Sequence, residues 1–450
     1  MTLLRSLGAL TLLACACDSR LLAVVPDDPG DLAMSGSDLP FLADLAIPSK
    51  PCHLIANGTP TDTLHWDDPQ SGWRNDGLQV VAGTRHVVHY GNVQLRFGGW
   101  SDPAAHTREY DVSTWPPTAV AADTELSFSM HAPSHMYQPD NGNIGAIWFS
   151  DNDGGGPSGV RFRSIVPGSW ALGPDIFLAE NSQLMSAPVQ RGDQFAIIHK
   201  PYNWTNPTVL YPLVSLFDRD GKRGPAVELT GVTGYSDQVT LGNTGSDLYA
   251  VTINYTCVGD MACTQTLEVL RVKGTSTVSL EKTTSIAVPI SGASASNPLL
   301  VSDHAQHHFL TWWETGDART ILYALPIHAD ATRAGPPEVW LSTPYQATTS
   351  QAFPSIGPLG VVYPVALALP PPDGGNWYLG EVHLLQRQLV ENAPVLDTVI
   401  TSDTGLSSYG VASVQLDNPR TLILGYSEYS ATPTTKGAYG RLARFTCSED

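Results

Sequence analysis

Two short segments carry residue types suited to proton transfer, HTREYDVSTW at 106–115 and HAPSHMYQPD at 131–140. Histidine, tyrosine and carboxylate side chains act as general acids and bases, and paired carboxylates cleave glycosidic bonds. Ordinary surface residues are the competing interpretation of both segments. The candidate catalytic residues are Arg108, Glu109, Tyr110, His131, His135, Tyr137 and Asp140.

Aspartate-rich tips are the candidates for metal binding. In FDRDGKRGP, Asp218 and Asp220 precede Gly221, but Lys222 and Arg223 follow at once. Calcium takes six to eight oxygen ligands, so this stretch predicts a hairpin turn in which Asp and Gly tolerate positive φ. The tip DNDGGG has no adjacent basic residue, so Asp151 and Asp153 are a weak candidate calcium site. No other cofactor is expected.

Histidines and aromatic residues cluster elsewhere. In DHAQHHF, His307 and His308 are neighbours that point to opposite faces of a strand, so we expect turn and packing histidines without a metal. Aromatic side chains stack on sugar rings or fill gaps between sheets. The candidate binding residues are Tyr202 and Trp204, in the predicted loop HKPYNWTNP, and Trp312 and Trp313, of which at least one is expected to be structural.

The elements that must position these residues are predicted to be strands. Gly and Pro make up 75 of 450 residues, and short runs rich in Val, Ile, Leu, Tyr, Trp and Thr lie between them. Five hairpins are predicted, with tips near 151–156, 218–224, 259–260, 316–317 and 433. With an approach strand and an outer strand, each unit has about four strands and about 55 residues, which is typical of a propeller blade.

The first residues predict export and lipid anchoring. The apolar run Leu7–Leu13 is too short to span a bilayer, and Leu12-Leu13-Ala14-Cys15 resembles a bacterial lipobox with Cys15 as the lipidated residue. An ordinary secretory signal, or lipidation of Cys17, are the alternatives. Residues 1–14 are therefore a predicted signal peptide, 15–50 an acidic, Pro-containing tether, and 51–450 the folded body.

Four cysteines remain in the body. Cys257 and Cys263 flank a predicted hairpin tip, which favours local pairing and leaves Cys52 to pair with Cys447. The absence of a C-x-x-C pattern disfavours zinc. Pairing of Cys52 with Cys447 would bring the two ends of the body together, as a closed ring requires.

The unit NPLLVSDHAQHHFLTWWETGDARTILYALPI, at 297–327, resembles the BNR-like and sialidase-like propeller repeat. The Asp-box S-x-D-x-G-x-x-W is absent. The lipobox, acidic tether and FDRDGKRGP-type hairpins together resemble propeller lipoproteins of high-GC Gram-negative bacteria. The resemblance implies an all-β fold with one propeller of about seven four-stranded blades, six or eight being the alternatives. Two β-sandwich domains, or a sandwich followed by a shorter propeller, are the competing folds.

Net charge restricts the partners. With 24 basic and 43 acidic residues, the chain carries −19, which disfavours nucleic acid and anionic lipid surfaces. We expect a protein of the outer membrane or cell surface that meets the membrane through its N-terminal lipid. Its expected function is a binding or scaffolding module for an envelope protein or glycan. A glycoside hydrolase or polysaccharide lyase is the alternative that the resemblance implies.

Overall fold

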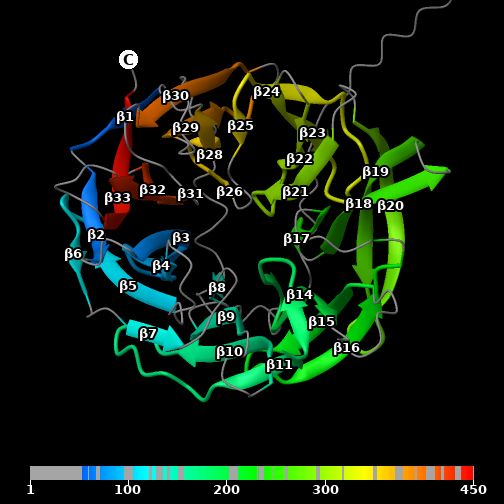
Figure 1. The fold of residues 1–450 in the computed structure, drawn as a ribbon, viewed down its shortest axis with the longest axis horizontal. Coiled ribbons are helices and arrows are strands. Elements are labelled where there is room, and N and C mark those ends of the chain that lie inside the picture. The colour runs from blue at the N-terminus through cyan, green and yellow to red at the C-terminus, as the bar shows by residue number, and fades with distance from the viewer. Residues whose placement is uncertain are drawn as a thin grey trace, which may run out of the picture. The chain divides into compact units, whose positions relative to one another are not determined.

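Short β-branched and aromatic runs form strands throughout the computed structural model (Figure 1). The chain divides into the units Met1–Ala46 and Ile47–Asp450, and all described residues belong to the second. No helix among them is long and apolar enough to cross a membrane. The structure describes residues 53–58, 60–66, 71–95, 105–120, 124–127, 135–138, 142–150, 157–201, 211–230, 232, 238–245, 247–258, 262–289, 294–316, 319–347, 352–369, 379–390, 393–401, 411–416, 420–430 and 437–448.

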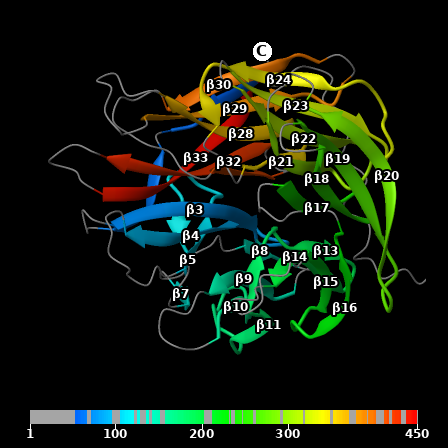
Figure 2. The ribbon, with the colours of Figure 1, turned by 45° about the vertical axis from the view of Figure 1, so that its right-hand side comes forward.

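The strands form seven sheets that follow one another around a ring (Figure 1). We call each sheet a blade and number the blades in chain order. In blades 1 to 6 the chain enters at the inner side and adds strands outward. In blade 7 it does so from β31 to β33, and strands from earlier in the chain complete the sheet on both sides. Figure 2 shows the blades from an oblique direction. The protein is therefore all-β with a seven-bladed propeller, as the repeat length predicted.

Blades 1 to 4 contain the strands from β3 to β20. Blade 1 consists of β3 (Ser71–Val80), β4 (His86–Leu95), β5 (Ala105–Asp111), β6 (Thr118–Ala119) and β7 (Thr124–Ser127). Blade 2 consists of β8 (His135–Tyr137), β9 (Ile144–Ser150), β10 (Gly159–Ile165) and β11 (Ile176–Glu180). Blade 3 consists of β12 (Ser182–Leu184), β13 (Val189–Arg191), β14 (Gln194–Pro201), β15 (Leu213–Asp218) and β16 (Arg223–Glu228). Blade 4 consists of β17 (Val239–Asn243), β18 (Leu248–Val258), β19 (Ala262–Lys273) and β20 (Ser279–Val288).

Blades 5 to 7 contain the remaining strands. Blade 5 consists of β21 (Ser294–Ser302), β22 (His308–Thr315), β23 (Thr320–Ile327) and β24 (Glu338–Thr343). Blade 6 consists of β25 (Gln346–Ala347), β27 (Ser355–Gly357), β28 (Gly360–Leu369), β29 (Leu379–Arg387) and β30 (Val395–Thr401). Blade 7 consists of β31 (Val411–Leu416), β32 (Thr421–Ser430) and β33 (Gly437–Ser448), joined by β26 (Ala352–Phe353), β1 (His53–Ala56) and β2 (Thr61–Trp66).

The five predicted hairpins all form. Four of them are the second and third strands of blades 2, 4, 5 and 7, and the fifth, β15 with β16, is the third and fourth strands of blade 3. The approach strand predicted for each unit corresponds, before the last two hairpins, to the inner strands β21 and β31.

The first and last strands close the ring in blade 7. Strands β1 and β2 both pair antiparallel with β33, so that Leu54 lies opposite Cys447 and Thr61 opposite Leu442. In Figure 1 the blue β1 lies beside the red β33. The beginning and end of the described body are therefore neighbours, as a closed ring requires.

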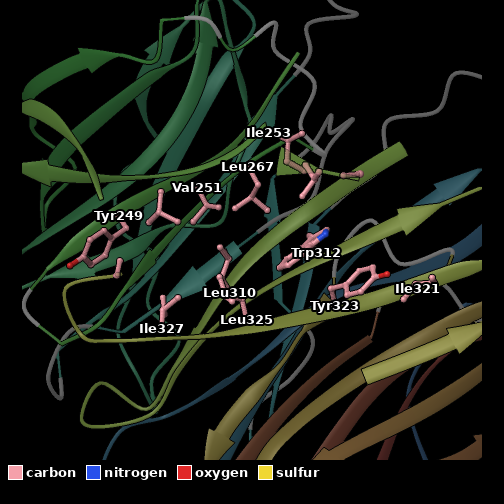
Figure 3. Packing of buried hydrophobic residues seen from close by; sticks show 14 residues of the cluster. Tyr249, Val251, Ile253, Leu267, Leu310, Trp312, Ile321, Tyr323, Leu325 and Ile327 are labelled. Carbon is pink, nitrogen blue, oxygen red and sulfur yellow. The ribbon is translucent and has the colours of Figure 1, made fainter. Parts of the chain in front are cut away.

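Most of the hydrophobic core lies between blades, because neighbouring blades cover both faces of each sheet. Figure 3 shows the contact between blades 4 and 5, where Tyr249, Val251 and Leu267 face Leu310 and Trp312. Strand β28 is covered on both faces, so nine of its ten residues are buried. Each fully buried Leu, Ile or Val contributes about 1.5–3 kcal/mol. The blades thus hold one another in place.

Candidate functional site

The topology divides the connections between strands into two sets. Because successive strands of a blade run antiparallel from its inner strand outward, the ends of the second strands and the beginnings of the third strands of all blades lie on one face of the ring. The ends of the first and third strands lie on the other face. We call the first the connection face. It is bounded by the strand ends Leu95 and Ala105, Ser150 and Gly159, Pro201 and Leu213, Val258 and Ala262, Thr315 and Thr320, Leu369 and Leu379, and Ser430 and Gly437.

Strand β5 sends its three candidate catalytic residues to two different blades. The guanidinium of Arg108 lies 5.6 Å from the ring centre of Tyr110, so these two side chains share a face. Tyr110 packs in a core cluster with Ile423 and Leu442 of blade 7. Glu109 points the other way, toward blade 2, as strand alternation requires.

The carboxylate of Glu109 joins blades 1 and 2. It is 1% exposed, and its Oε1 lies 2.6 Å from Nδ1 of His86 on β4. Its Oε2 accepts a hydrogen bond of 2.5 Å from the indole of Trp170, in the connection between β10 and β11. Trp170 has φ of 54°, an uncommon conformation for a bulky residue. Both carboxylate oxygens are therefore occupied by contacts within the protein.

Strand β8 places the other two described catalytic candidates inside the ring. The ring of His135 lies 5.8 Å, edge to face, from Phe353 of β26. Tyr137 packs 4.7 Å from Phe195 of blade 3, and burial is the main cause that raises its pKa. Gly145 makes room for this phenol, because a Cβ there would lie 2.3 Å from the Tyr137 ring. A buried phenol that holds its proton this firmly is a poor general base.

The described part of the candidate catalytic set is thus divided among separate contacts. Glu109 faces blade 2, Arg108 and Tyr110 lie on the opposite face of β5, and Tyr137 contacts blade 3. His131 and Asp140 lie outside the described residues.

The aromatic candidates on β22 are buried. Trp312 and Trp313 are 0% and 1% exposed, and Trp312 stacks 5.4 Å from Tyr323 and donates a hydrogen bond to Glu314. The structure therefore shows packing for both rings, and neither presents a face to a sugar. Tyr202 and Trp204 lie outside the described residues, in the segment between the strand ends Pro201 and Leu213.

The Asp218 tip is a turn, as predicted. Oδ1 of Asp218 accepts hydrogen bonds from the backbone N–H groups of Asp220 and Lys222, and Gly221 has φ of 80°. The carboxylate thus serves the local backbone. Asp151 and Asp153, the weak calcium candidates, lie outside the described residues.

The histidine-rich stretch forms the turn between β21 and β22. Oδ1 of Asp303 accepts three backbone N–H groups, while its Oδ2 lies 2.7 Å from Nδ1 of His307. His308 is buried, and its Nδ1 lies 2.8 Å from the Ser302 hydroxyl. Among the described residues no three His, Cys, Asp or Glu side chains are placed to hold a metal ion.

Cysteine positions follow from the strand register. Cys257 lies directly opposite Cys263 in the pairing of β18 with β19. Cys447 is disulfide-bonded, and it lies opposite Leu54, two residues after Cys52. Cys15 and Cys52 are outside the described residues, so the lipid at Cys15 and the pairing of Cys52 with Cys447 stay predictions.

Two polar contacts between strands were not predicted from the sequence. The Nε2 of His199 lies 2.9 Å from the hydroxyl of Ser215, both fully buried, and burial lowers the pKa of His199 to about 4. Arg387 of blade 6 donates two hydrogen bonds to Glu338 of blade 5, from Nε to Oε2 at 2.9 Å and from Nη2 to Oε1 at 3.1 Å. No short motif signals these pairs, because their members are 16 and 49 residues apart.

Comparisons with known proteins concern the fold. No family model matches the chain, and no curated protein matches it. Among solved structures, the β-propeller domain of the Trilobed protease from Pyrococcus furiosus is 8% identical with a TM-score of 0.47, covering 80% of this chain and 92% of that one. The parainfluenza virus 5 hemagglutinin-neuraminidase ectodomain is 9% identical with a TM-score of 0.47, covering 89% and 85%. The phage phi92 endosialidase is 11% identical with a TM-score of 0.43, covering 89% and 70%.

Proposed function

We propose that this protein is a cell-envelope binding or scaffolding module that holds a protein or glycan ligand at its connection face. The observation that carries the proposal is that the carboxylate of Glu109 is engaged in contacts between blades. Its two oxygens bind His86 and Trp170, and its side chain is 1% exposed. A carboxylate engaged in this way joins blades and is not available to a substrate. Tyr137, buried against Phe195, supports the same conclusion.

The proposed ligand contacts are Tyr202 and Trp204. The structure places the first three residues of HKPYNWTNP in β14, so the predicted loop is shortened to YNWTNP, at 202–207. The support is twofold: this aromatic sequence is typical of an exposed loop, and its flanking strand ends lie at the connection face. Aromatic rings provide large contact areas at low cost in conformational entropy and stack on the apolar faces of sugars.

Export and a lipid anchor at Cys15 are the proposed setting. The support is the lipobox-like stretch Leu12 to Cys15, followed by an acidic segment long enough to act as a tether. An anchor of several acyl chains would hold the propeller at an outer-membrane or cell-surface site. The net charge of −19 disfavours direct binding of the body to anionic lipid headgroups.

The test uses the full exported chain, made soluble by Cys15→Ser and Cys17→Ser. It is applied to an array of envelope glycans and solubilised envelope proteins, and in parallel to a polysaccharide-degradation screen. We expect binding without product, and about tenfold weaker binding for Trp204→Ala, which corresponds to about 1.4 kcal/mol. His304→Asn, in a first-to-second connection on the opposite face, is the control and should bind like the parent protein.

Two outcomes would contradict the proposal. Equal binding by the Trp204→Ala and His304→Asn variants would remove the assigned contact. Turnover of a polysaccharide that Tyr137→Phe abolishes would favour the alternative, a glycoside hydrolase or polysaccharide lyase that uses the β8 residues.

A further inference from the structure

Strands β29 and β30 of blade 6 bring one histidine between two carboxylates. Nδ1 of His383 lies 2.9 Å from Oδ1 of Asp397, and its Nε2 lies 3.2 Å from Oε2 of Glu381. The histidine side chain is 9% exposed, whereas those of Glu381 and Asp397 are 23% and 40% exposed. Asp397 lies on β30, and Glu381 and His383 lie on β29, so the contact with Asp397 crosses between strands.

When Glu381 and Asp397 are both ionised, only a doubly protonated ring satisfies this geometry. Ionised carboxylates only accept hydrogen bonds, so both ring nitrogens of His383 must donate. A neutral imidazole has one N–H and one lone pair, and the lone pair would then face a carboxylate oxygen. The two acidic partners accordingly raise the pKa of His383 above its usual value, against the effect of burial, which lowers it.

A second charged pair lies on this face among the described residues. On the same face of β29, Arg387 binds Glu338 of blade 5. From β28 the face carries Tyr363, whose pKa burial raises to about 12, so that it stays neutral. Glu381 and Asp397 are thus the charges that act on His383.

Strand β30 depends on such contacts because it is an edge strand. It pairs with β29 on one side only, and Val399, opposite His383, is 48% exposed. An edge strand has fewer apolar contacts than an inner one, so it is an element that opens locally while the ring stays closed.

We propose that Glu381, His383 and Asp397 form a proton-operated clamp, which fastens the edge strand β30 to β29 when His383 is protonated and releases it as the pH rises. The folded state binds the proton more tightly than the open state does. The stabilisation is therefore complete below the ordinary histidine pKa of about 6.5 and disappears as the pH rises through the raised pKa of the closed clamp. This proposal does not rest on the proposed ligand at the connection face.

Hydrogen exchange of the whole protein tests the clamp. After correction for the intrinsic exchange rate, protection of residues 395–401 should fall by up to tenfold per pH unit as His383 loses its proton. Residues 338–343, the edge strand of blade 5, are the internal control and should show no matching change. In His383→Gln the protection of 395–401 should no longer follow pH.

A second measurement covers the case in which His383→Gln fails to fold. NMR titration of the imidazole should give a pKa above 6.5 in the parent protein and a lower pKa in both Asp397→Asn and Glu381→Gln. Three results would each overturn the proposal. They are protection of 395–401 in the parent protein that does not change with pH, the same pH dependence in His383→Gln, and an imidazole pKa below 6.5.

Discussion

Oε2 of Glu109 and Nε1 of Trp170 lie 2.5 Å apart, although the two residues are 61 positions apart in the chain. Their hydrogen bond joins the third strand of blade 1 to the connection between the last two strands of blade 2. Glu109 is thus a residue of a type suited to catalysis that instead holds two blades together. The coupling energy of its contact with Trp170 can be measured.

We predict that Glu109→Ala lowers the free energy of unfolding by about 2–4 kcal/mol, since it leaves the buried indole N–H without an acceptor. Trp170→Phe should cost about 1.5–3 kcal/mol for the lost charged hydrogen bond. In urea unfolding, the double variant should lose at least about 1 kcal/mol less than the sum of the two. Glu338→Ala, in blade 5, should add to Trp170→Phe without coupling. Additivity of Glu109→Ala with Trp170→Phe would contradict the contact.

Alanine substitutions at two glycines distinguish the cost of backbone strain from the cost of steric crowding. Gly192 and Gly221 both have positive φ, at 57° and 80°, but a Cβ on Gly192 meets open space, whereas one on Gly221 lies 2.7 Å from Cδ1 of Ile176. We predict a loss of about 1–2 kcal/mol for Gly192→Ala from conformation alone. Gly221→Ala should lose about 1–3 kcal/mol more, because it also overpacks the turn. Equal melting temperatures for the two variants would mean that the β15–β16 turn does not rest on blade 2.

We predict that acid lowers the free energy of unfolding in part by protonating His199. Burial, with a smaller effect from Arg223, lowers the pKa of His199 to about 4. Between about pH 6.5 and pH 4, therefore, His199 is protonated in the unfolded chain but neutral in the folded chain. This contribution to stability is complete above pH 6.5 and is lost as the pH falls toward 4, by about 3 kcal/mol at most. Denaturant unfolding at a series of pH values should show a shallower decline for His199→Gln. Parallel curves for the two proteins would contradict a neutral buried imidazole.

The fold could be predicted in outline because its signals are local. Tips such as Asp218 to Gly221 combine turn chemistry with flanking apolar runs, and five hairpins were recognised in this way. The second-to-third hairpins of blades 1, 3 and 6 were not. Strand β28 is buried on both faces, so it shows no alternation, and it contains Pro364, which normally argues against a central strand.

The candidate site could be predicted only as residue types. Whether Glu109 faces solvent or blade 2 depends on the register of β5 within blade 1 and on the position of Trp170 in the next blade. The same holds for Trp312 and Trp313, whose burial on both faces follows from having a blade on either side. Contacts between blades join distant segments, and no local pattern records them.

The lipid anchor has a separate test. Mass spectrometry of the mature N-terminus should find acyl chains on Cys15 in cells that process lipoproteins, and globomycin should leave the signal peptide attached. Cys15→Ser should remove the acyl chains, while Cys17→Ser should not. A freely secreted and unmodified chain in untreated cells would reject the anchor, and acyl chains that persist in Cys15→Ser would move it to Cys17.

The central claim is that the two ends of the body close a ring, which places the second-to-third connections of all seven blades on one face. Peptide mapping of the exported protein without reductant tests it most directly. The account predicts one bond between the peptides that hold Cys52 and Cys447, and another between those that hold Cys257 and Cys263. A bond between Cys52 and Cys257 would contradict the closure of blade 7 by β1 and β33.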